Sequence, residues 1–122
     1  MAATQPPWIA ELRVILVHPD GRRVPGRIAV GQPHTAGGGD PAGHDESRCA
    51  IEVTGLHSRE HAIIGGGSLQ ALLLGVRFLG SRLHDFVSRG GRVIDPTDDS
   101  DIPLETLFGP MWGAFGATND PP

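Results

Sequence analysis

The feature that most constrains the fold is one long amphipathic segment bounded by glycines. Its apolar residues recur at the i, i+3, i+4 and i+7 spacing of a helix face, as Leu69, Leu72, Leu73, Val76, Leu79, Leu83, Phe86 and Val87. Glycines at 65–67 precede the segment, glycines at 90 and 91 follow it, and Ser68 is placed to cap its first turn. The pattern predicts one helix of about twenty residues, roughly 30 Å long, which is enough to cross a four-stranded sheet.

Four shorter segments before this helix alternate apolar and polar residues, as half-buried strands do. They cover residues 9–18, 23–30, 48–55 and 60–64, and residues 92–94 offer a fifth. His-Pro-Asp-Gly-Arg at 18–22 is a strong turn signal that predicts a hairpin. Pro25 predicts that residues 23–30 form an edge strand or contain a bulge, because proline cannot donate to a ladder. We therefore expect an α+β fold: an antiparallel meander of four to five strands with one long helix packed on one face.

The 122 residues suit a single domain with an ordered core over about residues 8–94. Residues 31–47 lack periodicity and are rich in Gly, Pro and Asp, which predicts a long loop. Residues 95–122 form an acidic tail that is also rich in glycine and aromatic residues. Within it, residues 104–108 are compatible with one helical turn. Met111, Trp112 and Phe115 indicate that the tail docks on the rest of the protein.

Charge is unevenly distributed along the chain. Residues 1–92 hold all ten basic residues, every one an Arg, whereas residues 93–122 hold six acidic residues and no Arg. Because nucleic-acid binding draws on clustered positive charge, and nothing here exceeds one Arg pair, we expect no nucleic-acid partner. The acidic tail instead suggests contact with a basic protein partner through Asp98, Asp99, Asp101 and Trp112, and the alternative is a simply solvated acidic loop.

A flank of the predicted helix suggests a second interaction surface. Leu74 and Phe78 lie off the main apolar stripe, beside Ala71 and Gly75. This flank is too apolar for a freely solvated face. We expect it to meet either the C-terminal segment or a second copy of the protein, which would make a homodimer.

Cys49 and two histidines offer the residue types of a metal site. Zinc binds imidazole and thiolate, and His57, His61 and Cys49 lie within thirteen residues of one another. The two histidines lack the helical H-E-x-x-H context, and on an extended strand they would sit about 13 Å apart. The alternative is that they are solvated histidines beside a buried strand cysteine, whose thiol would be inert.

The glycines before the helix offer the geometry of an anion site. Gly66, Gly67 and Ser68 stand at a predicted helix N-terminus, where free N–H groups attract anions, and Arg59 could assist. The alternative is a tight strand-to-helix connection, for which glycine is also the suitable residue.

The segments RCAIEVTGL and GGGSLQALLLGVRFLGSRL, within residues 48–83, resemble a family of small bacterial domains of unknown function. In that family a Cys-bearing strand precedes an S-L-Q-A-L helix with the same apolar rhythm. The resemblance implies a fold and carries no activity with it.

Taken together, these patterns favour a non-catalytic protein-interaction module that binds a protein partner or itself. The alternative is a metal- or small-anion-binding protein, with or without enzymatic activity, that uses His57, His61 and Cys49. The absence of Lys excludes a Walker-type phosphate loop and a Schiff-base lysine. We expect no cofactor, no catalytic residues and no membrane segment. We also expect a cytoplasmic location, because residues 1–8 lack the features of a signal peptide.

Overall fold

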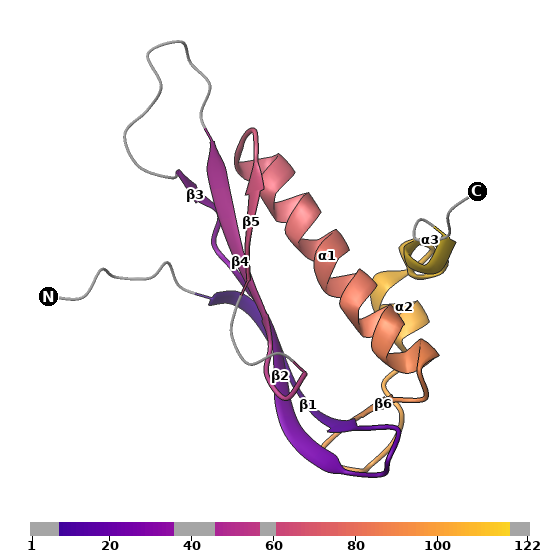
Figure 1. Ribbon diagram of the computed structural model, residues 1–122. Helices are drawn as coiled ribbons and strands as arrows, with labels where there is room; N and C mark the ends of the chain where they lie inside the picture. The colour runs from indigo at the N-terminus through magenta and orange to yellow at the C-terminus, as the bar shows by residue number, and fades with distance from the viewer. Residues whose placement is uncertain (1–7, 36–45, 57–60, 118–122) are drawn as a thin grey trace, which may run out of the picture.

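The computed structural model describes residues 8–35, 46–56 and 61–117. In chain order the elements are β1 (Trp8–Val17), β2 (Arg23–Gly31), β3 (His34–Thr35), β4 (Ser47–Val53), β5 (His61–Gly65), α1 (Ser68–Ser88), β6 (Arg92–Ile94), α2 (Leu104–Phe108) and α3 (Met111–Ala117). The sheet forms one layer, α1 lies along one of its faces, and α2 and α3 lie on the far side of α1 (Figure 1). The predicted α+β fold is confirmed.

The sheet is an antiparallel meander, as the alternation predicts. β1 pairs with β2, β2 with β4 and β4 with β5, while β6 returns to pair with the end of β1. The predicted turn is present: the N–H of His18 donates to the carbonyl of Arg22 at 2.8 Å, and Gly21 adopts a φ of 90°. The short strand β3, which pairs with the start of β4, has no counterpart in the predicted pattern.

Pro25 gives a wrong prediction for its strand. β2 is a central strand, flanked by β1 along its whole length and by β4 over Ile28–Val30. Pro25 is tolerated because at its level only β1 pairs with β2, so the missing N–H removes no ladder bond on the other side. The irregularity in register lies elsewhere, between Trp8 and Ala10 of β1.

The helix α1 packs on the sheet through small residues in its N-terminal half and through Leu79, Leu83 and Phe86 in its C-terminal half. Ala71 is fully buried, and a Cβ added at Gly75 would lie 3.2 Å from the Cys49 sulfur and 3.4 Å from Ile51. The small residues of this flank thus face β4, while partner binding through Leu74 and Phe78 stays a prediction. Leu69 and Leu73, which were expected to point into the core, are 67% and 58% exposed.

The ends of α1 follow from its flanking glycines. The N–H of Gly91 donates to Phe86 and that of Gly90 to Val87, the paired bonds of a Schellman stop, with Gly90 at a φ of 100°. At the other end Gly67 is the N-cap residue and no side chain caps it, so the expected Ser68 cap is wrong. The side chain of Gln70 instead accepts a hydrogen bond from the Gly66 N–H.

The tail folds back onto α1. Leu104 of α2 and Phe115 of α3 are buried, at 4% exposure each, and α3 lies directly over Gly80. Trp112 stacks on Phe108 at 5.6 Å between ring centroids and meets the His84 ring at 4.9 Å. These contacts attach residues 104–115 to the C-terminal half of α1. The predicted docking of the aromatic residues is thus present.

Candidate functional site

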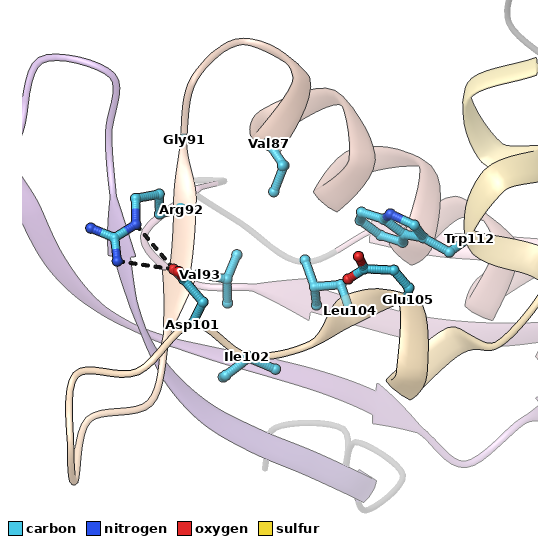
Figure 2. A pocket seen from close by; sticks show the side chains of 9 residues that line it. All are labelled: Val87, Gly91, Arg92, Val93, Asp101, Ile102, Leu104, Glu105 and Trp112. Carbon is cyan, nitrogen blue, oxygen red and sulfur yellow. Dashed lines mark hydrogen bonds and ion pairs between the residues drawn. The ribbon is translucent and has the colours of Figure 1, made fainter.

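A cleft of about 400 Å³ lies where the end of α1, β6 and α2 meet (Figure 2). Its size is within the range of small-ligand and side-chain pockets. Its walls come from segments that are far apart in the chain and become neighbours through the stop after α1 and the fold-back of the tail. The lining residues are Val87, Gly91, Arg92, Val93, Asp101, Ile102, Leu104, Glu105 and Trp112.

The β6 side of the cleft is fixed by backbone hydrogen bonds. After the turn at Gly90 and Gly91 the chain enters β6, and the Ile102 N–H donates to the carbonyl of Val93 at 2.9 Å. Ile94 and Asp101 form an isolated antiparallel bridge. Residues 92–94 and 101–102 therefore form a short ribbon that holds one wall of the cleft in place.

Charged groups stand at both ends of the cleft. At one end the Arg92 guanidinium meets a carboxylate oxygen of Asp101 at 3.0 Å (Figure 2). At the other end Glu105 lies beside Trp112 (Figure 2). Among the residues that the structure describes, no ion pair engages Glu105. Since Arg92 and Asp101 neutralise each other, Glu105 leaves the cleft with a net negative charge.

The floor of the cleft is apolar, and its aromatic wall is held rigidly. Val93 and Leu104 are buried, while Val87 and Trp112 border the opening. Trp112 is clamped by His84 on α1 and Phe108 on α2, so its indole ring has little freedom to move away. The cleft can therefore accept a group with an apolar stem and a positively charged end.

Two of the four tail residues predicted to bind a partner, Asp101 and Trp112, line this cleft together. The other two have local roles: Asp99 pairs with Arg23 at 2.9 Å, and Asp98 accepts hydrogen bonds from the side chain and backbone of Ser100. Those bonds hold the pKa of the Asp98 carboxyl below its usual value. Asp98 and Asp99 thus shape the turn that precedes the cleft.

The predicted helix-flank residues Leu74 and Phe78 are partly covered by the protein itself. Phe78 packs against the hydrophobic core, and its ring lies 5.1 Å from the ring of His61. Leu74 borders a shallow hollow with Gly66, Gly67 and Ser68. As binding residues for a partner, both stay a prediction.

Of the proposed metal residues, the structure describes Cys49 and His61. Cys49 is fully buried under Gly75, its thiol lies 3.4 Å from the carbonyl of Gly31, and burial raises the pKa of that thiol. His61 lies against Phe78, and His57 is outside the described residues. Within residues 8–35, 46–56 and 61–117, no three His, Cys, Asp or Glu side chains come together in a metal-binding group.

The proposed anion residues are only partly placed. Gly66, Gly67 and Ser68 stand at the start of α1. The Gly66 N–H already donates a hydrogen bond to the Gln70 side chain, so it is not available to an anion. Arg59 lies outside the described residues.

Sequence reasoning missed Arg92, Glu105 and Val87 as parts of one site. Arg92 was predicted to lie in a strand and Val87 on the apolar stripe of the helix. Glu105 was noted only as one of the acidic residues of the tail. The available signal was the lone Trp112 following a short apolar helix, a residue too large to remain unsupported in a solvated tail.

Comparisons with protein-family models, with curated proteins and with solved structures find no match for this chain. The resemblance of residues 48–83 to small bacterial domains therefore stays an expectation. None of the helices in the described ranges has both the length and the apolar character that a membrane span requires.

Proposed function

We propose that this protein is a non-catalytic interaction module that binds a basic segment of a partner protein in the cleft between α1, β6 and α2. The observation that carries the proposal is the pairing of a packed indole, Trp112, with a carboxylate, Glu105, that has no ion pair within the described parts of the chain, above an apolar floor. An arginine side chain fits this arrangement, because its stem is apolar and its guanidinium binds both carboxylates and aromatic faces.

The charge distribution supports a basic partner. No Arg or Lys occurs from residue 93 onward, and five acidic residues lie within the eleven-residue segment 95–105: Asp95, Asp98, Asp99, Asp101 and Glu105. Such a field attracts a positively charged segment and speeds its encounter with the cleft. The ion pairs of Asp99 and Asp101 reduce this field without removing it.

A binding role is favoured over catalysis by the chemistry of the lining. Glu105 is the one acidic group of the lining without an ion pair among the described residues, and no nucleophile or His lines the cleft. The thiol of Cys49, the only cysteine in the chain, is buried far from it in sequence and structure. The lining therefore supports recognition of a side chain more readily than a bond-breaking reaction.

The test is an NMR titration with N-acetyl-arginine-N-methylamide, using the citrulline analogue as the uncharged control. We expect the arginine compound to shift the indole N–H signal of Trp112 and to leave that of Trp8 unchanged. Glu105→Gln should weaken binding at least tenfold, since a hydrogen bond to a charged group contributes roughly 1.5–3 kcal/mol.

Glu46→Gln is the matched control, because Glu46 is an exposed acidic residue directly before β4 and does not line the cleft. It should bind the arginine compound as the wild type does. Equal shifts with the arginine and citrulline compounds, or an unchanged affinity in Glu105→Gln, would contradict the proposal.

A further inference from the structure

The outer edge of β1 is unpaired over most of its length. On one side β1 pairs with β2 along Trp8–Val17, but on the other side β6 pairs only with Ile15–Val17. No strand in the described parts of the chain pairs with residues 8–14 at that edge. Figure 1 shows this half of β1 extending away from α1. A free strand edge is a template for another strand, and it is independent of the cleft described above.

The hairpin register shows which backbone groups point outward. The His18 N–H donates to the Arg22 carbonyl, so these two residues form a hydrogen-bonded pair. Bonded and non-bonded pairs alternate along an antiparallel ladder, so Leu16, Val14 and Leu12 bond to β2. The backbone N–H and C=O groups of Glu11 and Arg13 therefore point to the free edge.

The contacts of β6 agree with this assignment. The carbonyl of Val93, the residue opposite Leu16, accepts a hydrogen bond from Ile102, so it points away from β1. The bonds between β1 and β6 then fall at Ile15 and Val17. Odd-numbered residues of β1 thus present their backbone groups to this edge, and β6 uses the last two of them.

The side chains at the free edge are exposed on both faces of the sheet. Leu12 lies on the same face as the buried Val14 and Leu16, yet it is 36% exposed because α1 does not reach this half of the strand. On the opposite face Glu11 and Arg13 are exposed and carry opposite charges two residues apart.

We propose that two copies of this protein associate through antiparallel pairing of their β1 edges, with Leu12 on the twofold axis. A twofold axis between antiparallel strands runs perpendicular to the sheet. The two residues of each cross-strand pair must therefore direct their side chains to the same face of the sheet. Within residues 8–14 the axis can then pass through any residue from Ile9 to Arg13. An axis through Glu11 or Arg13 places like charges opposite each other, which is repulsive, and an axis through Ile9 or Ala10 forms no charge pair. Only the Leu12 register places Glu11 opposite the partner's Arg13.

The Leu12 register also satisfies the backbone. Glu11 and the partner's Arg13 both direct N–H and C=O groups outward, so they form a hydrogen-bonded pair. The two Leu12 residues form the closer, non-bonded pair, with Cα atoms about 4.5 Å apart, and each covers the other's exposed side chain. The pairing extends over residues 10–14 and stops where β6 begins.

Glu11 is available for this contact. It lies 3.7 Å from Arg27, but the shorter contact of Arg27, at 2.6 Å, is with Glu52. The Glu11 side chain remains 43% exposed. Its carboxylate can therefore meet Arg13 of the partner subunit without breaking the Arg27–Glu52 pair.

A charge-swap experiment tests the proposal, with oligomeric state measured by analytical ultracentrifugation. The wild type should sediment as a dimer. Glu11→Arg and Arg13→Glu should each weaken dimerisation at least tenfold, because each places like charges opposite one another. The double variant, Glu11→Arg with Arg13→Glu, should recover the dimer. A monomeric wild type, or single variants that dimerise as the wild type does, would overturn the proposal.

Engineered cysteines test the register independently. Leu12→Cys should form an intermolecular disulfide under mild oxidation, because Cα atoms across a non-bonded pair lie within disulfide range. The native Cys49 is buried and does not compete. Ala10→Cys, on the same face and exposed, is the matched control and should stay uncrosslinked, since two Ala10 residues would lie about 13 Å apart. Crosslinking of Ala10→Cys in preference to Leu12→Cys would overturn the register, and circular dichroism confirms that each variant is folded.

Discussion

At the scale of single residues, Cys49 shows how packing determines chemistry. Its thiol lies between the sheet and the backbone of Gly75, with no exposed surface. Burial disfavours the charged thiolate and raises the pKa of the thiol, so the side chain behaves as a small apolar group. The alternation Cys49-Ile51-Val53 predicted this burial correctly, because all three side chains occupy the same face of one strand.

The Cys49 thiol should therefore resist Ellman's reagent at pH 8 in the folded protein and react fully in guanidinium chloride. Its raised pKa also implies a pH effect. Above the usual pKa of about 8.5, the unfolded chain loses a proton that the folded chain keeps, so stability falls as pH rises. Urea unfolding at pH 7 and pH 9.5 should show this loss in the wild type, whereas Cys49→Ala should lack that component. Rapid labelling of the native protein would contradict the buried position.

At the scale of elements, the docking of α3 depends on one missing side chain. A Cβ at Gly80 would overlap the ring of Phe115, whereas one at Gly113 in α3 would meet nothing. Both glycines are helical, so alanine gains about 1 kcal/mol of helix propensity at either position. At Gly80 that gain is outweighed by overpacking, which costs about 1–3 kcal/mol and pushes α3 away from α1.

We therefore expect Gly80→Ala to lower the melting temperature and to shift Trp112 fluorescence toward that of a solvated indole. Gly113→Ala should raise the melting temperature or leave it unchanged, with native fluorescence. Thermal unfolding followed by circular dichroism and by fluorescence measures both effects. If Gly80→Ala is as stable as Gly113→Ala, then α3 does not pack on α1 as described.

The elements themselves could be predicted from periodicity, but the orientation of α1 could not. The predicted apolar stripe is buried at Leu79, Leu83 and Phe86. Its Leu69 and Leu73 are exposed, and at their end of the helix the sheet is contacted by Ala71 and Gly75. Close approach of a helix to a sheet requires small side chains, and a pattern that counts only apolar residues gives them little weight. The large leucines were assigned to the sheet because nothing in the sequence indicates which apolar face α3 will cover.

At the scale of the whole molecule, pairing of β1 edges would join two sheets into one. Backbone amides at the free edge should then exchange more slowly as protein concentration rises. We expect this for Glu11 and Arg13, whose N–H groups point outward, while the amides of β5 keep their rates. Hydrogen exchange followed by NMR at two concentrations measures it. Rates at Glu11 and Arg13 that do not depend on concentration would contradict the paired edge.

The cleft is a property of the assembled molecule, which explains why the sequence revealed only part of it. Asp101 and Trp112 were singled out by residue type, from local acidity and from an unsupported aromatic ring. Arg92 and Val87 join them only because the turn at Gly90 and Gly91 reverses the chain and α2 folds back. Which side chains meet depends on the length of the turn at Gly90 and Gly91 and on the fold-back of α2, and no sequence motif records either.

The position of α1 between the sheet and α3 has a thermodynamic consequence. One helix supplies a wall to the hydrophobic core through Leu83 and Phe86 and a wall to the cleft through Val87, and its His84 packs against Trp112. Occupancy of the cleft and integrity of the sheet are therefore linked through the same turns of helix. A ligand that binds the folded cleft raises the unfolding free energy of the protein. In return, a substitution at Leu83 of α1 that populates the unfolded state lowers the apparent affinity for the ligand.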